Sequence, residues 1–124
     1  MIRLGINTLI WSGRFGEQEF PLLDKIRAWG ADVVEIPIFD PGAVEAAPIR
    51  RAIADSGLAL TVCTALPRGF SLVSAEAVVR QKTRDWLRLA VDRVAAAGGT
   101  LLVGPVYAPV GELPGRRTDT QWHH

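Results

Sequence analysis

Side chains that could bind a small ligand lie near the ends of four apolar stretches of the sequence. Glu35 lies inside the apolar run 33–38, where burying a carboxylate is costly unless it is paired, hydrogen-bonded or protonated. An amide such as Asn7 can orient a hydroxyl group, and aromatic rings can form an apolar wall against the carbon face of a small polyol. The full set of candidate substrate-binding residues is Asn7, Trp11, Phe15, Glu35, Cys63, Pro105 and Tyr107.

Each candidate also has a purely structural interpretation. Glu35 could form an ion pair or bind backbone groups, and Asn7 could cap a turn. The aromatic side chains could be ordinary packing residues. Cys63 would need a nearby base or a group that lowers its pKa to act as a nucleophile, and the sequence shows neither close by. We therefore interpret Cys63 as a small apolar wall residue.

Sequence motifs for cofactor chemistry are absent. The segment after the first apolar stretch reads INTLIWSGRFG, which is not the GxGxxG of a dinucleotide site, and no GxxxxGK[ST] phosphate loop occurs. There is no HExxH and no cysteine pair, and the only two histidines are His123 and His124 at the chain end. Adjacent helical side chains point about 100° apart, so this pair makes a poor metal site. The motif search thus gives no cofactor site and no internal set of metal ligands in this chain.

The elements that position the candidates are predicted from three joints. Helix-like stretches end on Gly30, Gly57 and Gly98, and each runs directly into an apolar strand. Glycine tolerates the left-handed backbone that caps a helix. Strands are expected at 2–11, 33–39, 58–65 and 100–106, and the last three are expected to be covered on both faces.

Three helices are expected between these strands. Residues 21–29 form an amphipathic helix, and a weaker helix follows the turn at 40–42, where Pro48 must bend or restart it. The third helix starts at an N-cap, Ser74, with Glu76 in its first turn, and its buried stripe is expected to be Val79, Thr83, Trp86, Leu87, Ala90, Val91 and Val94. Residues 108–124 read as a loop-like tail.

Alternating strands and helices predict the α/β class with a parallel sheet. Both an open doubly wound sheet and a closed (β/α)8 barrel fit this pattern, and a barrel takes about 250 residues. The 124 residues correspond to about the first half of a barrel, with four strands and three helices in one incomplete domain, 1–124. The alternatives are a small open sheet, a half barrel that pairs with another half, and a fragment of a longer protein. In all parallel α/β folds the site forms at the carboxyl ends of the strands.

Composition sets the remaining bounds. Hydrophobic residues make up 48% and charged residues 22% of the chain, and the net charge is +1. These values are ordinary for a folded domain and give no basic field for nucleic acid or an anionic membrane. No secretory signal or long apolar segment is seen, and the single cysteine fits a reducing compartment. We expect a cytoplasmic protein that binds neither nucleic acid nor membrane.

Several longer stretches, in order, resemble a known family: LGINTLIWSG, VVEIPIFD, GLALTVCTALP, the run from SAEAVVRQKTRDWLRLAVDRVAAAGG to TLLVGPVYAPVG, and GRRTDTQW. Together they resemble the N-terminal half of sugar phosphate isomerases and epimerases with a xylose isomerase-like TIM barrel, and most of all the D-tagatose and D-psicose (allulose) 3-epimerase relatives. The likeness covers essentially the whole chain, and its most specific part is the helix bearing Arg80 together with the following GGTLLVGPVY.

This resemblance implies a metal-dependent enzyme of carbohydrate metabolism that uses Mn2+, Mg2+ or Co2+ and inverts a ketose carbon beside the carbonyl through an enediolate. In the family, the catalytic glutamates and the metal ligands come from strands five to eight, which lie beyond this chain. The first strand and the following loop of the family line the sugar pocket, and they match Asn7, Trp11 and Phe15. Cys63 matches the third-strand residue that faces the sugar. The end of the fourth strand matches Pro105 and Tyr107. In the ketose 3-epimerases an aromatic residue often occupies the position of Asn7, so the identity of the sugar is not determined. A broader sugar or sugar phosphate isomerase is an alternative, in which Arg116 and Arg117 could contact the phosphate, although both are expected to be surface residues.

Two hypotheses follow. In the first, the chain is the N-terminal half of a metal-dependent sugar epimerase or isomerase and shows no turnover alone. In the second, it is a non-catalytic half-barrel module that associates with itself as a homo-oligomer, or with a second half, through its exposed sheet edge. An endonuclease acting on abasic DNA, from the same superfamily, is disfavoured because the chain lacks a basic stripe and early histidine ligands.

Overall fold

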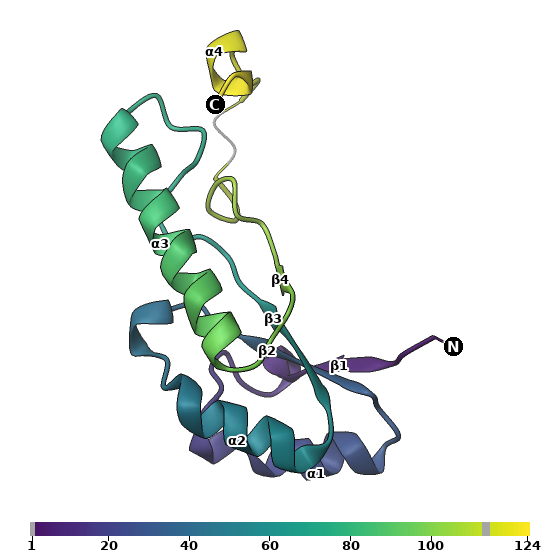
Figure 1. Cartoon of the computed structure of the whole chain (residues 1–124). Coiled ribbons are helices and arrows are strands. Elements are labelled where there is room, and N and C mark those ends of the chain that lie inside the picture. Colours follow the sequence, from purple (N-terminus) through teal and green to yellow (C-terminus); the bar gives the residue numbers. More distant parts are fainter. Residues whose placement is uncertain (1, 113–114) are drawn as a thin grey trace.

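The computed structural model describes residues 2–112 and 115–124 and shows one parallel sheet with the order β1-β2-β3-β4. The strands are β1 (Gly5–Asn7), β2 (Val33–Pro37), β3 (Ala59–Cys63) and β4 (Leu102–Val103). They are connected by α1 (Pro21–Ala28), α2 (Ala46–Ser56) and α3 (Ala77–Ala96), as Figure 1 shows. The predicted class is confirmed: four parallel strands alternate with three main helices.

Glycine joints end the helices as predicted. Gly30, Gly57 and Gly98 have φ angles of 81°, 69° and 89°, in the left-handed region that a side chain disfavours. Each lies just past the end of α1, α2 or α3, and the chain then turns back into the sheet. These joints bring the strands into one parallel array.

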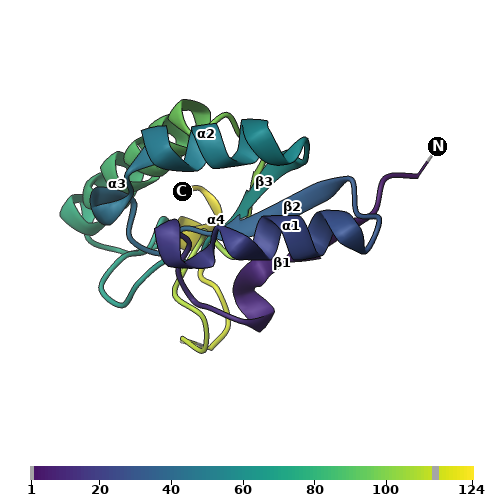
Figure 2. The same ribbon diagram turned by 90° about the horizontal axis from the view of Figure 1, so that it is seen from below.

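The three main helices cover one face of the sheet, and none of the described helices covers the opposite face, called the open face below (Figure 2). Val34, Ile36 and Val62 point toward the helices and are fully buried together with Ile26 of α1. Strand residues one position away lie on the open face and are only half-buried: Val33, Glu35, Ala59, Thr61 and Cys63. The prediction that both faces are covered is therefore wrong for these residues, because successive side chains alternate between faces and helices pack on only one of them.

The first strand is much shorter than predicted. It ends at Asn7, where a 3-10 turn, η1 (Thr8–Ile10), begins, because the Asn7 side chain accepts a hydrogen bond from the Leu9 amide and caps that turn. Two further 3-10 turns, η2 (Glu17–Glu19) and η3 (Pro41–Ala43), precede α1 and α2. Residues 8–11 therefore belong to the loop after β1 rather than to the strand.

The boundaries of two helices also differ from the prediction. Pro48 lies in the first turn of α2, where a missing amide hydrogen costs nothing, so the helix has no break there. Ser74 does not cap α3; its hydroxyl accepts from the Glu76 amide in the preceding loop, and Glu76 is the N-cap position. Val91, placed in the buried stripe, is exposed on α3.

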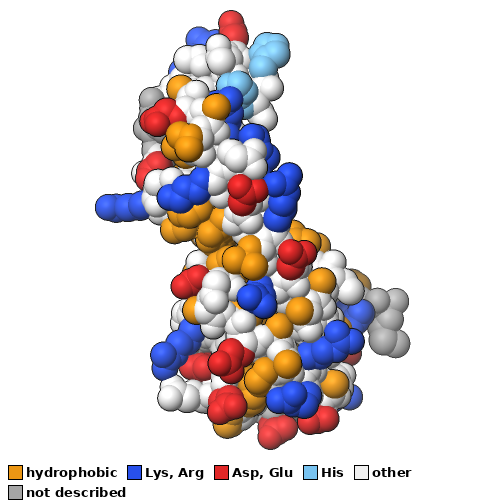
Figure 3. All heavy atoms as spheres, turned by 60° about the vertical axis from the view of Figure 1, so that its left-hand side comes forward, with side chains coloured by type: hydrophobic (Ala, Val, Ile, Leu, Met, Phe, Trp, Pro, Cys, Tyr) orange, Lys and Arg blue, Asp and Glu red, His pale blue; other side chains and the backbone are white. Residues whose placement is uncertain are grey.

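The tail after β4 is not entirely a loop. It contains a single helical turn, α4 (Asp119–Trp122), with a capping box formed by Thr118 and Gln121. In Figure 1, α4 lies at the same end of the molecule as the start of α3. Among the described residues, none of the helices is both long and apolar enough to cross a bilayer. Figure 3 shows acidic and basic side chains interspersed on one face, with hydrophobic side chains gathered at its narrow middle.

Candidate functional site

A hydrogen-bonded group of side chains occupies the open face of the sheet at the carboxyl end of the first three strands. The Nδ2 of Asn7 donates to Glu35 Oε1 at 2.7 Å, and the Thr61 hydroxyl donates to Glu35 Oε2 at 3.2 Å. The strand register explains this contact, because Asn7 pairs with Glu35 across β1 and β2, and Glu35 pairs with Thr61 across β2 and β3. Cross-strand neighbours on one face lie close enough to bond directly.

All the hydrogen-bonding groups of the Asn7 amide face partners. Besides the bond to Glu35, its Nδ2 lies 3.4 Å from the sulfur of Cys63, and its Oδ1 accepts from the Leu9 amide at 2.8 Å. An amide flipped by 180° would set an oxygen against the Glu35 carboxylate, so these partners define the orientation. The structure thus gives Asn7 the capping role that the sequence left as an alternative. Its contact with a ligand stays a prediction.

Cys63 ends β3 beside this group and is half-buried. Burial raises the pKa of the Cys63 thiol and the nearby charge of Glu35 adds to this effect, while the hydrogen bond from Asn7 acts in the opposite direction. Since a thiolate is the nucleophilic form, the thiol is poorly suited to nucleophilic chemistry at neutral pH. This environment is consistent with the interpretation of Cys63 as a wall residue.

The Trp11 ring contacts Lys25 of α1 and Trp29, which directly follows α1. Its ring lies 5.9 Å from that of Trp29, and the Lys25 ammonium lies 5.3 Å from the Trp11 ring and 5.0 Å from the Trp29 ring. A cation over two indoles contributes a modest attraction at an exposed site. The structure therefore places Trp11 in a cation–π cluster beside β1, the edge strand, and its role as a sugar wall stays a prediction.

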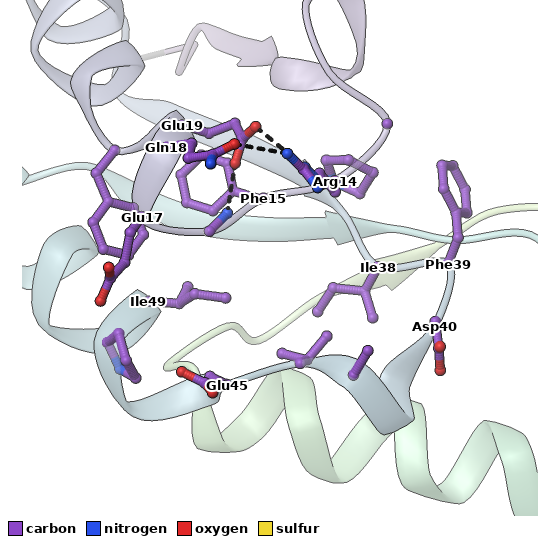
Figure 4. A pocket seen from close by; sticks show the side chains of 17 residues that line it. Arg14, Phe15, Glu17, Gln18, Glu19, Ile38, Phe39, Asp40, Glu45 and Ile49 are labelled. Carbon is purple, nitrogen blue, oxygen red and sulfur yellow. Dashed lines mark hydrogen bonds and ion pairs between the residues drawn. The ribbon is translucent and has the colours of Figure 1, made fainter.

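Phe15 lines a cavity of about 600 Å³ between the loop after β1 and the loop after β2. Figure 4 shows Phe15, Ile38 and Ile49 around this space, with the acidic side chain of Glu45 on the α2 side. The Phe15 ring is only 9% exposed and packs on Phe20 at 5.8 Å between ring centres. Phe15 thus belongs to the core beneath the helices as well as to the cavity wall.

The strand-four candidates follow β4, at the opposite edge of the sheet from β1. Pro105 and Tyr107 are exposed, and the guanidinium of Arg117 lies 5.7 Å from the centre of the Tyr107 ring. The Tyr107 carbonyl accepts from the Leu72 amide at 2.9 Å, which ties the end of β4 to the loop before α3. Arg116 is exposed in the tail.

The structure thus brings together Asn7, Glu35 and Cys63, and it places Trp11, Phe15 and the strand-four pair in other contacts. The sequence analysis missed Thr61 as the fourth member of the group. Thr61 lies two residues before Cys63, and side chains two apart in a strand share a face. That period of two was a usable signal for Thr61.

The described residues do not fit a divalent metal. No cluster of three or more His, Cys, Asp and Glu side chains able to hold an ion occurs in 2–112 and 115–124. Glu35, the one carboxylate of the group, already uses both oxygens as acceptors from Asn7 and Thr61, and no second carboxylate joins it in the group. Hard cations require several oxygen ligands, so no metal role is assigned to these residues.

Comparisons with known proteins agree with this architecture. No protein-family profile matches the chain. Among curated proteins, a probable ketose 3-epimerase of Synechocystis sp. is 32% identical over 92% of this chain and 40% of its own length. A ketose 3-epimerase of Arthrobacter globiformis is 29% identical over 86% of this chain and 37% of its own length.

Solved structures agree as well. A structure of L-ribulose 3-epimerase superimposes with a TM-score of 0.86 at 28% identity, covering 98% of this chain and 41% of that one. The D-allulose 3-epimerase from Methylomonas sp., in complex with D-allulose, gives a TM-score of 0.87 at 24% identity and shows the likeness of fold alone, over 97% of this chain and 42% of that chain. The chain therefore spans about 40% of the length of the curated relatives it matches. The expected likeness to the first half of a TIM barrel is confirmed.

Proposed function

We propose that this chain forms one wall of the sugar pocket of a ketose 3-epimerase. The reason is that the chain is homologous to the N-terminal part of ketose 3-epimerases with a xylose isomerase-like TIM barrel. The observation that carries this proposal is the 115-residue match to the probable ketose 3-epimerase. The reaction of the intact protein would be proton transfer beside the carbonyl of a ketose. The substrate class is a small sugar, free or phosphorylated.

The open face supports a pocket role. In a closed barrel this face lines the interior, and ligands bind where the carboxyl ends of the strands meet. Asn7, Glu35 and Cys63 stand at that end, and polar groups of this kind are suited to the hydroxyls of a sugar. The side chains of this chain bind and orient, and the groups that move protons come from outside residues 1–124.

The metal of the intact enzyme belongs to the same proposal. A divalent ion would polarise the carbonyl and hydroxyl oxygens of the ketose when bound, and its ligands would lie outside the described residues. We therefore derive no step of proton transfer from Glu35. A cytoplasmic location and the lack of nucleic-acid partners stay predictions.

A complementation experiment tests the proposed function. The purified 124-residue chain is assayed with D-fructose, D-allulose, D-tagatose and L-ribulose in the presence of Mn2+, Mg2+ or Co2+, and no epimerisation is expected. The chain is then fused to the remaining C-terminal part of the Arthrobacter globiformis relative, and the fusion should epimerise at least one ketose. Turnover by the chain alone, or a folded fusion that neither binds nor converts any of the ketoses, would contradict the proposal.

A second candidate function is supported by the unprotected edges of the sheet. Both backbone groups of Leu4 bond to the start of β2: its N–H donates to the Asp32 carboxylate, and its carbonyl accepts from the Asp32 and Val33 amides. Since consecutive residues of a strand face opposite edges, the backbone groups of Gly5 face outward from the sheet. The edge carries exposed apolar side chains such as Leu4 and, on β4, Val103, where natural edges usually carry charge or proline. Such a half barrel could act as a non-catalytic module that associates with a second copy of itself.

A further inference from the structure

We propose that Glu35 is a positioning residue that holds the loop after β1, defined here as residues 8–20, in its place at the mouth of the sheet. Two separate groups of Glu35 bond to the last residue of β1 and to the first residue of this loop. Its carboxylate accepts from Asn7, and its backbone carbonyl accepts from the Thr8 hydroxyl at 3.3 Å. The relevance of this loop to a ligand rests on the proposed function, whereas the positioning itself does not.

Glu35 is itself held from the other side. Thr61 of β3 donates to Glu35 Oε2, so the carboxylate is bonded on both its oxygens by neighbours from two different strands. A carboxylate with both oxygens engaged has little rotational freedom, and hydrogen bonds to a charged group are stronger than neutral ones. The side chain can therefore transmit the position of β3 to the end of β1.

Asn7 passes this constraint into the loop. Its Oδ1 accepts from the Leu9 amide, so the amide group that Glu35 orients is the same group that caps the first turn of the loop. Thr8 is fully buried, and its carbonyl accepts from the amides of Trp11 and Ser12. Residues 7–12 thus form one hydrogen-bonded unit attached to Glu35.

The unit carries one aromatic side chain and precedes another. Trp11 belongs to the unit and is partly exposed, and Phe15, three residues beyond Ser12, lines the cavity of about 600 Å³. A change in the orientation of the Asn7 amide would therefore shift the segment that carries both rings. This places the effect of Glu35 on the loop rather than on a reacting atom.

Residue-resolved hydrogen exchange on the 124-residue chain tests the proposal. In Glu35→Met, which keeps the length of the side chain but removes both acceptors, the amides of Leu9, Trp11 and Ser12 should exchange about tenfold faster. The amides of Val62 and Ala97, bonded within the sheet and α3, should change by less than about threefold. Thr61→Val is the matched control, because it removes a bond to Glu35 without touching the loop, and its effect on the loop amides should be smaller.

A conservative variant separates positioning from a general loss of stability. Glu35→Gln keeps one oxygen to accept from Asn7 and should retain most of the loop protection that Glu35→Met loses. This variant also gives a result if Glu35→Met does not fold. Unchanged loop exchange in folded Glu35→Met, an equal change at all amides, or Glu35→Gln behaving like an unfolded chain would overturn the proposal. None of these readouts depends on ketose turnover, so they fail or succeed independently of the proposed function.

Discussion

The Asn7 amide donates to the Glu35 carboxylate at 2.7 Å across the first pair of strands. Both residues occupy the open face, in direct register between β1 and β2. This bond joins the strand end to the turn that follows it, because the same Asn7 side chain caps η1. One short contact thus links sheet geometry, loop geometry and the polar surface that a sugar would meet.

Replacing Asn7 by Asp should destabilise the chain by about 1–3 kcal/mol, since it exchanges a donor for a second carboxylate beside Glu35. Urea unfolding at pH 7 measures the loss. Equal stability of Asn7→Asp and wild type at pH 7 would show that this contact is not important in solution.

Gly104 should be intolerant of any side chain. A Cβ at this position would lie 1.8 Å from the Thr64 carbonyl oxygen, and its φ angle is 142°. Gly104→Ala should therefore cost about 3 kcal/mol or more, because the backbone of Thr64, just after β3, must move. Gly13→Ala is the control, since nothing lies within 4 Å of its Cβ position and its φ is not positive, and it should change stability by about 0.5 kcal/mol or less. Thermal unfolding of both variants makes the comparison.

Much of the fold could be predicted because it depends on local properties of the chain. A glycine such as Gly57 marks a helix end through its own backbone freedom, and the apolar runs behind it have the length of buried strands. The open face could not be predicted in the same way. Whether Glu35 is covered depends on which elements pack over β2, and the described helices pack on the other face of the sheet.

The site could be predicted only in part, for a related reason. Asn7, Glu35 and Cys63 were identified because polar residues at strand ends are unusual, but their bonds depend on the strand register. Thr61 was missed although it shares a face with Cys63, and its bond to Glu35 follows from the pairing of β2 with β3. Trp11 was expected in an extended strand, and the η1 turn after Asn7 instead takes it to Trp29.

The Cys63 thiol should react slowly with iodoacetamide at neutral pH. Burial, and to a smaller extent the charge of Glu35, raises the pKa of this thiol. The alkylation rate of the folded protein should therefore increase at a higher pH than the alkylation rate of the protein unfolded in urea. The raised pKa means that the folded state holds this proton more tightly. Its contribution to stability is therefore fully present below the pKa of the unfolded thiol and is lost as the pH rises through that of the folded thiol. Glu35→Gln should shift the alkylation profile to lower pH, and a profile identical to the unfolded chain would contradict this assignment.

The free edges of the sheet should make this chain associate with a second copy of itself. If β4 of one copy pairs in parallel with β1 of the other, two such contacts close a ring of eight strands, and no edge remains. Light scattering after gel filtration should then give a dimer at tens of micromolar, and the double variant Leu4→Lys with Val103→Lys should be monomeric because charge blocks edge pairing. Val78→Lys, 71% exposed on α3 and away from both edges, is the control and should remain a dimer. A wild-type chain that stays monomeric at all concentrations, with the circular dichroism of a folded α/β protein, would show that the open edges do not pair with each other.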